Sequence, residues 1–389
     1  MNFKVAYLAN GQLHLKSGDS AAQPVESEFG ESLRNSRRQI QRRNAWKKNP
    51  LAQMVFQEAE SNDLETKQPI TLTGICNGVA GQLFYALSTV GMGGILALDV
   101  DRQKENRLFH SADFSVHDLS YLAEQDLLAC SLRHPSGEAN IATMKADGIR
   151  PAEITEGDSL DLAPAWIPGQ KKALVFQSAG IARSGEGVLM AQGPFAIEKL
   201  DFEAGTVDTL VSDPNYDFLA PQMLADGRLY YIRRPYRKIP TPSFWNLLKR
   251  VLVMPFLLAY AVFQWLNLFT LRYTGKPMIK QPDRPKATGI GQAVLHGQAV
   301  DTNQEAERNQ KFEDEDSPAL VPRNWELVCQ AGDGEVQTIA RGVVAFHVGQ
   351  DGSVVYTNGG AIYGIVPGGV ANRILKEKGR LIEQVKLLV

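Results

Sequence analysis

The sequence predicts an all-β fold, a β-propeller, because one pattern of residues repeats along the chain. Asp161-Leu-Ala-Pro-Ala-Trp166 leads into the apolar run 173–178, and Asp217-Phe-Leu-Ala-Pro221 leads into the similar run 227–232. Short apolar runs also recur elsewhere, separated by residue pairs that are typical of tight turns. Repetition of one strand-turn-strand unit at this scale is typical of a propeller, in which each repeat forms one blade.

Strands are predicted wherever a short apolar or alternating run is bounded by turn residues. Asp-Gly pairs begin at Asp147, Asp226, Asp333 and Asp351 and predict turns between such runs. In chain order, the predicted strands are 5–8, 12–15, 82–87, 95–100, 127–132, 140–144, 174–177, 187–191, 196–200, 229–232, 325–329, 343–347, 354–357 and 361–366.

The number of blades follows from the turns that precede each innermost strand. Such turns are predicted near Asn77-Gly78, at Asp118, at Asp161, at Asp217 and near Arg341-Gly342, which gives five units. A sixth blade forms if the C-terminal run 384–389 pairs with the N-terminal strands, which would close the ring and remove exposed edges. We expect six blades of four antiparallel strands, in a single domain that spans residues 1–389.

Two insertions interrupt the repeats. The first, residues 30–70, is basic, with Arg34, Arg37, Arg38, Arg42, Arg43, Lys47 and Lys48 around Trp46. The second, residues 236–322, contains a predicted hydrophobic helix at 244–271 and a polar, acidic stretch at 288–317. Because that stretch has no apolar run, it is predicted to be a disordered linker.

Composition gives few further constraints on function. The net charge of −2 provides no general attraction for nucleic acid, and no nucleic-acid partner is expected. Residues 1–11 alternate and contain an Asn-Gly turn pair, so a strand is predicted there and a signal peptide is not. Cys76, Cys130 and Cys329 lie far apart in apolar surroundings and are predicted to be small buried residues in a reducing compartment.

The repeat resembles that of a known family. Residues 140–148, 154–157 and 161–178 are similar to the repeat of TolB-like (WD40-like, PD40) propellers, and the likeness extends over about residues 115 to 235. It implies a six-bladed propeller that acts mainly as a platform for binding proteins or gating substrates. The chain departs from the family's Ser-Pro-Asp-Gly turn, since Ile167-Pro-Gly-Gln170 stands there. The repeat also occurs in prolyl-oligopeptidase-like peptidases, but no G-x-S-x-G nucleophile elbow is present.

The second insertion contains 21 uncharged residues, 251–271, which as a helix would span about 31 Å, one bilayer core. A single crossing would place residues 1–235 and 323–389 on opposite sides of a membrane and prevent ring closure. An even number of crossings, a re-entrant turn at Pro255 or a helix lying in the interface is therefore required. The candidate membrane-contact residues are Trp245, Lys249, Arg250, Phe256, Phe263, Trp265, Phe269 and Arg272.

Charge supports membrane contact as well. Residues 227–282 contain no acidic residue but ten basic ones, a bias typical of segments that face anionic lipid on the cytoplasmic side. These are Arg228, Arg233, Arg234, Arg237, Lys238, Lys249, Arg250, Arg272, Lys276 and Lys280. The alternative stays open that the hydrophobic insertion packs on the propeller itself or is buried in a partner protein.

Candidate catalytic groups are few. The six histidines show no metal-ligating spacing, and no catalytic or metal-binding residue is predicted. Asp161 and Asp217 are interpreted as equivalent repeat positions that, with Asp118, stabilise blade turns beside Pro164 and Pro221. A channel-bound calcium ion is the alternative role for the carboxylates, and otherwise no cofactor is expected.

Together these observations predict a non-enzymatic scaffold that binds an unknown protein partner, attached peripherally or monotopically to the cytoplasmic side of a membrane through residues 244–271. The alternative is a hydrolase or lactonase-like propeller enzyme that uses a cation in its central channel.

Overall fold

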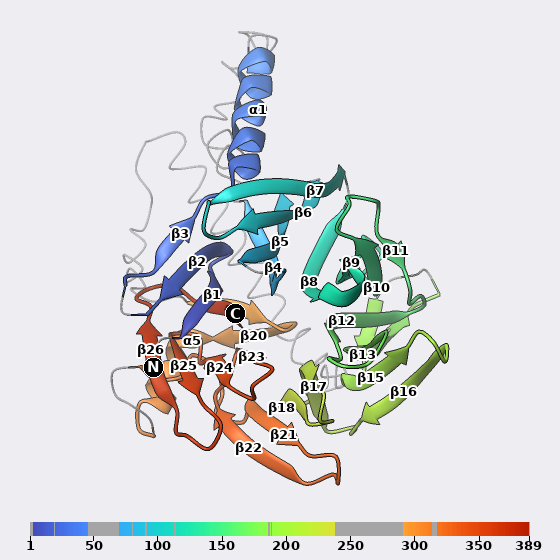
Figure 1. Ribbon diagram of the computed structural model, residues 1–389, viewed down its shortest axis with the longest axis vertical. Coiled ribbons are helices and arrows are strands. Elements are labelled where there is room, and N and C mark those ends of the chain that lie inside the picture. The colour runs from blue at the N-terminus through green and yellow to red at the C-terminus, as the bar shows by residue number, and fades with distance from the viewer. Residues whose placement is uncertain are drawn as a thin grey trace, which may run out of the picture. The chain divides into compact units, whose positions relative to one another are not determined.

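The computed structural model describes residues 3–18, 20–45, 70–79, 81–89, 92–112, 114–185, 187, 189–237, 291–312 and 317–388 (Figure 1). Contacts within the chain separate residues 1–236 and 290–389, which form the propeller, from a second unit at 237–289. The hydrophobic helix predicted at 244–271 therefore lies outside the described residues, as does the part of the first insertion from 46 to 69.

The described strands form six blades, and in each the strands are antiparallel neighbours. The first blade contains β27 (Ile382–Leu387), β1 (Lys4–Ala9), β2 (Gln12–Ser17) and β3 (Gln23–Val25). The second contains β4 (Thr71–Asn77), β5 (Gln82–Thr89), β6 (Met92–Asp99) and β7 (Lys104–Ala112). The third contains β8 (Ser115–Leu122), β9 (Leu127–Arg133), β10 (Ala139–Lys145) and β11 (Ala152–Glu153).

The other three blades follow the same plan. The fourth blade contains β12 (Ser159–Trp166), β13 (Ala173–Arg183), β15 (Ala196–Asp201) and β16 (Thr206–Val211), and the short β14 (Leu189–Gln192) pairs with the end of β13. The fifth contains β17 (Tyr216–Met223), β18 (Leu229–Pro235), β21 (Glu326–Gln330) and β22 (Val336–Arg341). The sixth contains β23 (Ala345–Val348), β24 (Val354–Thr357), β25 (Ala361–Ile365) and β26 (Asn372–Lys376).

The first strand of each blade is its innermost strand, and these six strands contact one another in circular order: β27, β4, β8, β12, β17 and β23, then β27 again. The circle closes because the C-terminal β27 pairs with the N-terminal β1, with Val5 opposite Leu387 and Tyr7 opposite Val385. This confirms both the propeller fold and the predicted closure by the C-terminal strand. Closure gives β1 a strand partner on both sides, and β27 becomes the innermost edge of its blade.

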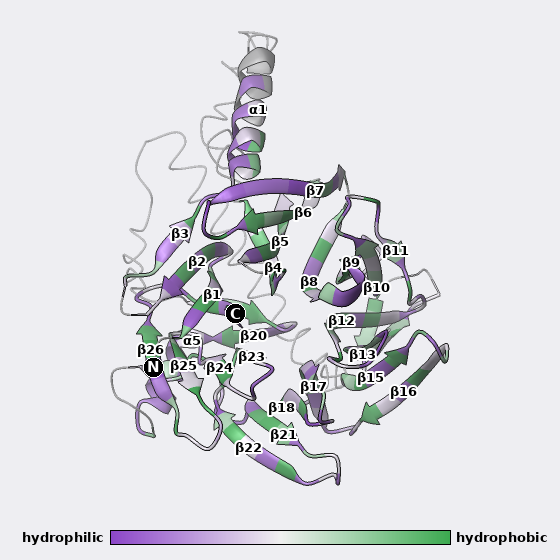
Figure 2. Cartoon of the chain, in the orientation of Figure 1, coloured by the Kyte–Doolittle hydropathy of each residue, from purple (hydrophilic) through white to green (hydrophobic). Residues whose placement is uncertain are grey.

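Hydrophobic patterning explains which strands could be predicted from the sequence. The second strand of a blade is buried on both faces, as in β5, whose residues 83–87 are all buried. Outer strands have exposed faces, so β7, β16, β22 and β26 are rich in polar residues and were not predicted (Figure 2). The innermost strands β4, β8, β12 and β17 were also missed. The turn predicted near Asn77 follows β4 instead of preceding the innermost strand, and Asp118, Asp161 and Asp217, predicted to lie in such turns, lie within β8, β12 and β17. A bulge interrupts the pairing pattern of each of these four strands.

Side chains join each blade to the next through the backbone of the neighbouring innermost strand. For example, Gln177 accepts the Ala220 N–H at 2.7 Å, and Gln222 bonds both Phe346 O and the Val348 N–H. The other four pairs of neighbouring blades are joined in the same way. Gln384 donates to Thr73 O and accepts the Ile75 N–H, and the Thr73 hydroxyl donates to Val116 O. Asp118 and Ser131 accept the Ala163 N–H, and His347 accepts the Leu387 N–H. These bonds satisfy buried backbone groups that the blade ladders leave free.

Most of the predicted acidic linker is ordered. Within 288–317, the described residues form the hairpin β19 (Gln292–Leu295) and β20 (Gln298–Asp301), followed by α5 (Thr302–Asn309). Asp301 caps this helix by accepting the Gln304 N–H, and the Asn309 amide donates to Ala319 O and Val321 O. For residues 291–312 the prediction of disorder was wrong, because single buried apolar residues and local capping order this stretch without an apolar run. Residues 288–290 and 313–316 lie outside the described residues.

The first insertion begins as α1 (Glu28–Ala45). Its first turn is attached to the second blade: the Phe29 N–H donates to Glu105, and the Phe29 ring lies beneath the Arg107 guanidinium and beside His110. Gly30 lies so close to Ile70 that a Cβ at this position would be 2.9 Å from its methyl carbon. The beginning of the basic insertion is therefore a helix fixed at its N-terminal end.

Candidate functional site

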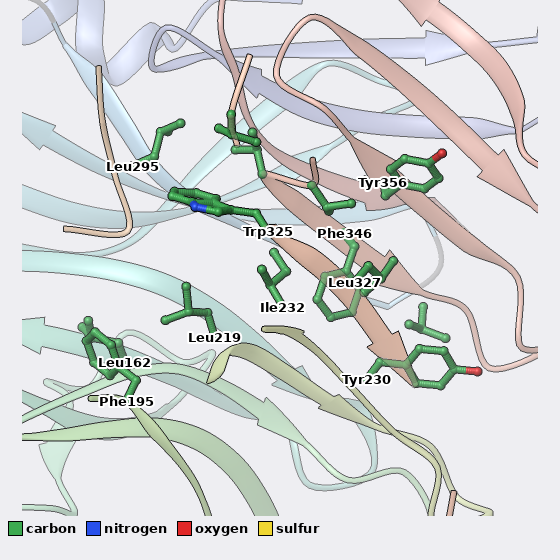
Figure 3. Close-up of a cluster of buried hydrophobic side chains, with 14 of the residues drawn as sticks. Leu162, Phe195, Leu219, Tyr230, Ile232, Leu295, Trp325, Leu327, Phe346 and Tyr356 are labelled. Carbon is green, nitrogen blue, oxygen red and sulfur yellow. The ribbon is translucent and has the colours of Figure 1, made fainter. Parts of the chain in front are cut away.

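The hairpin β19–β20 returns the second insertion to the propeller core. Leu295 and Val300 are buried in the largest hydrophobic cluster, which also contains Trp325 from the connection before β21. Figure 3 shows Trp325 in this cluster with Leu295, Ile232 and Phe346 around it. The hairpin is therefore part of the folded ring rather than an appendage of the insertion.

Arg234, near the end of β18, holds the turn of this hairpin. Its guanidinium donates to Asp217 Oδ2 at 2.9 Å, to His296 O at 2.8 Å and to Leu295 O at 3.4 Å. The same group lies 4.8 Å from the centre of the Trp325 ring, a cation–π contact. Arg234 and Asp217 are 2% and 3% exposed, so this ion pair is fully enclosed.

The buried position of Arg234 corrects the interpretation of the basic residues in 227–282. Arg234 lies in the interior, Arg233 bonds Glu326 at 2.8 Å, and Arg228 bonds Asp226 at 2.7 Å. Their acidic partners come from segments before and after the run, so its lack of acidic residues does not leave these three arginines facing a lipid surface. Of the other seven, Arg237 is described without such a partner, and the rest lie outside the described residues.

A second polar cluster lies on the innermost strands and consists of His117 and Asp118 of β8, His347 of β23 and Lys386 of β27. Each side chain is half-buried, although its strand is enclosed by neighbouring blades. We call these four residues the central cluster, because Asp118 acts electrostatically on both His117 and Lys386, and Lys386 acts on His347.

Burial governs the protonation of this cluster. It lowers the pKa of Lys386, an effect that Cys76 and the Asp118 carboxylate partly offset. It lowers the pKa of His347 well below its usual range, and the nearby Lys386 ammonium lowers it further. Burial likewise lowers the pKa of His117, against the opposing effect of Asp118. The imidazoles are therefore held neutral near pH 7, when charging them would place cations in a poorly solvated space.

The pKa of His296 is also lowered by burial and by the Arg234 guanidinium. Its Nε2 lies 2.8 Å from Val344 O, and because a carbonyl only accepts, this nitrogen carries the ring proton. The neutral imidazole thus joins the tip of the hairpin β19–β20 to the connection that precedes β23.

Acidification is expected to destabilise the ring through His347. Its folded-state pKa lies below the unfolded value of about 6.5, so the unfolded chain takes up a proton first as the pH falls. Stability is complete above that pH and is lost below it, by up to about 1.4 kcal/mol per pH unit for one histidine. Replacing His347 by asparagine, which can still accept the Leu387 N–H, should make the free energy of unfolding depend less steeply on pH between 6.5 and 5.

Urea titrations at several pH values measure this slope. At pH 8 both proteins carry a neutral group at residue 347, so the difference there isolates the packing cost of the substitution. Equal slopes for the two proteins below pH 6.5 would contradict the role assigned to His347.

The carboxylates predicted to stabilise blade turns occupy three different positions. Asp118 is itself the bulge residue of β8, with φ of 46°, and accepts the Ala163 N–H. Asp161 lies one residue before Leu162, the last paired residue before its bulge, and accepts from Ser178 Oγ at 2.7 Å. Asp217 lies two residues before the corresponding Leu219.

Asp161 and Asp217 are therefore not equivalent. A shift of one residue turns a strand side chain to the opposite face of its sheet, and only Asp217 reaches an arginine. Pro164 and Pro221 do occupy matching positions, each after an alanine with positive φ and inside a bulge, where no ladder hydrogen bond requires their missing N–H.

No cluster of three or more His, Cys, Asp or Glu side chains that could hold a metal ion occurs in the part of the chain that the structure describes. Cys76, Cys130 and Cys329 are all buried and free, as predicted. Burial raises the pKa of the Cys76 and Cys130 thiols to about 12.

The eight candidate membrane-contact residues, from Trp245 to Arg272, lie outside the described residues. Among the helices that are described, none is long and apolar enough to cross a membrane.

The sequence did not predict the four residues that form the buried polar contacts of the site: Arg234, His296, His347 and Lys386. Arg234 was interpreted as part of a surface charge run. Lys386 had a signal, since it lies between Val385 and Leu387 in the strand predicted to close the ring, where a charge is unusual.

No protein-family model and no curated protein matches the chain. Among solved structures, a chain of a nidogen/laminin complex matches with a TM-score of 0.50 and 7% identity, over 99% of this chain and 98% of the other. TolB from Acinetobacter baumannii matches at 0.47 and 11% identity, over 98% and 67%. A protein from Lactobacillus plantarum matches at 0.45 and 10% identity, over the whole of both chains. At these identities the likeness is one of fold, and the neighbours include TolB and other propellers.

Proposed function

We propose that the protein is a membrane-associated propeller scaffold, without catalytic activity, that presents its ring to a protein partner. The similar repeat residues at 140–178 support kinship with TolB-like propellers as part of the same proposal. The membrane contact would be made by residues 244–271, on the cytoplasmic side, in a peripheral or monotopic mode.

One observation carries the proposal: the two strands that flank the second insertion are neighbours in one blade. β18 pairs with β21 from Leu229 opposite Gln330 to Arg233 opposite Glu326. The uncharged stretch 251–271 therefore leaves one blade and returns to it. A segment with this topology suits attachment from one side of a bilayer, since the ring must remain whole on that side.

The ordered hairpin supports the same arrangement. Arg234 near the exit of the insertion bonds the backbone of Leu295 and His296 near its return, so the chain re-enters the ring beside the point where it left. An insertion held this way can be removed without opening the blade, which makes a clean deletion possible.

Fractionation tests the membrane contact. The full-length protein is compared with a version in which a short glycine–serine linker replaces residues 240–275, and the membrane pellet is washed with salt, alkaline carbonate and detergent. We expect only the full-length protein to pellet and carbonate or detergent, but not salt, to release it. A matched control keeps the length of the segment but replaces Phe256, Phe263 and Phe269 by serine, and it should remain soluble.

The proposal fails if the full-length protein stays soluble while both variants fold and show the same melting temperature as it does. Its partner-binding part is tested by cross-linking at the membrane: a cross-linked product of fixed mass is expected with the full-length protein and not with the deletion. Turnover of any substrate by the purified propeller would overturn the non-enzymatic part.

A further inference from the structure

Lys386 is a charged side chain inside the ring for which the described residues provide no partner. It lies in β27 opposite Ala6, on an innermost strand that contacts β23 on one side and β4 on the other. Its ammonium makes no hydrogen bond and no ion pair with any residue that the structure describes. An ammonium has three donors and no acceptor, and enclosing it without a partner is unfavourable.

The groups around Lys386 are also incompletely satisfied. Asn77 donates through Nδ2 to Leu387 O at 2.7 Å, yet its buried Oδ1 has no partner among the described residues. His347 accepts the Leu387 N–H at Nδ1, so the neutral ring carries its proton on Nε2, a free donor in the described structure. The Asp118 carboxylate is near enough to act electrostatically on Lys386, but no salt bridge joins them.

These groups require two kinds of partner, a hydrogen-bond acceptor and a hydrogen-bond donor. Lys386 and His347 Nε2 are donors, and the donor charge of Lys386 calls for an anion. Asn77 Oδ1 is an acceptor that lacks a donor, and the Asp118 carboxylate, which already accepts the Ala163 N–H, has lone pairs left for a further donor. A simple inorganic anion would satisfy only the first pair of groups.

We propose that Lys386, His347, Asn77 and Asp118 bind a small carboxylate that also carries an amino or hydroxyl group. Its carboxylate accepts from Lys386 and from His347 Nε2. Its amino or hydroxyl group donates to Asn77 Oδ1 or to Asp118. The ligand class is thus that of small amino acids and hydroxy acids, bound at the middle of the ring and independently of any membrane contact.

Isothermal titration calorimetry of the full-length protein tests the site, with glycine, L-serine, L-lactate, acetate and orthophosphate as the probes. We expect at least one of the first three to bind, and to bind at least ~10-fold more tightly than acetate, which lacks the donor. Replacing Lys386 by methionine should weaken that binding by at least ~10-fold, because it removes a charged hydrogen-bond donor.

Lys4 to methionine is the matched control, since it removes an exposed lysine from β1 of the same blade. It should bind as the unaltered protein does. Thermal melting shows whether K386M is folded. Without ligand, K386M should be at least as stable as the unaltered protein, because the substitution removes an unpartnered ammonium. Ligand should raise the melting temperature of the unaltered protein but not that of K386M.

Three results would overturn the proposal: no heat of binding with any of the five probes, equal binding by K386M and K4M, or orthophosphate and acetate binding as tightly as the amino and hydroxy acids. The last result would show that only the charge of Lys386 is recognised.

Discussion

Replacing Arg234 by methionine is expected to lower the free energy of unfolding by about 3 to 5 kcal/mol, the cost of removing one partner of a buried ion pair. Methionine retains much of the side-chain volume of arginine and still packs against Trp325. The loss of stability therefore measures the effect of removing the charged guanidinium. Asp217 would remain enclosed with only the Phe195 N–H bonded to its Oδ1, and the carbonyls of Leu295 and His296 would lose their donor. Urea unfolding followed by tryptophan fluorescence measures the change.

The neighbouring Arg233 provides the matched control. Its side chain is 32% exposed and its partner Glu326 is 18% exposed, so water screens the pair and R233M should cost less than about 1 kcal/mol. Adding Asp217→Asn to R234M should restore part of the loss, because the buried charge disappears while the amide oxygen can still accept the Phe195 N–H. If R234M were no more destabilised than R233M, Arg234 would not hold the hairpin.

These two adjacent arginines show where sequence reasoning about charge fails. Both belong to a run without acidic residues, and a charge count treats them alike. Arg233 is paired with Glu326, which lies 93 residues later, and Arg234 with Asp217, which lies 17 residues earlier. Strand pairing brings each arginine opposite its partner. Register decides which arginine is buried, and register depends on the bulge at Ala220, which the sequence does not reveal.

The strands were predicted from the sequence to the extent that they are buried. Asp-Gly turns were predicted correctly, with positive φ at Gly148, Gly227, Gly334 and Gly352. Strands of the interior have continuous apolar runs, whereas outer strands such as β7 face solvent and show no periodic pattern. The closing strand was predicted because β27 combines apolar residues with a location at the end of the chain, where only the N-terminal strands were unpaired.

The central cluster could not be predicted because its members come from three blades. His117 lies more than two hundred residues before His347 and Lys386, which are 39 residues apart, and each alone is an ordinary polar residue in a strand. Their proximity is a property of the closed ring, since innermost strands meet only after all six blades have assembled.

Ring closure itself is the source of the second large effect. Ending the chain after Arg380 removes β27, and we expect the truncated protein to lose its cooperative unfolding transition. Ile382 and Val385 are fully buried against β1 and β24, and without them Val5, Tyr7 and Val355 would be exposed to solvent. Gln384 and Leu387, which join the first blade to the second and sixth, would be lost as well. Differential scanning calorimetry and size-exclusion chromatography measure the outcome.

A chain that ends after Leu388 is the matched control, because it retains all of β27, the bond from the Leu388 N–H to Lys4 O and the packing of the Leu388 side chain. It should unfold cooperatively, within about 1.5 kcal/mol of the full-length protein. A synthetic peptide of residues 378–389 should restore a cooperative transition to the shorter chain, since β1 would then present an unpaired edge of matching register. If the chain ending after Arg380 melted like the full-length protein, the fold would not depend on closure by β27, and the central cluster would have to persist without the strand that carries Lys386.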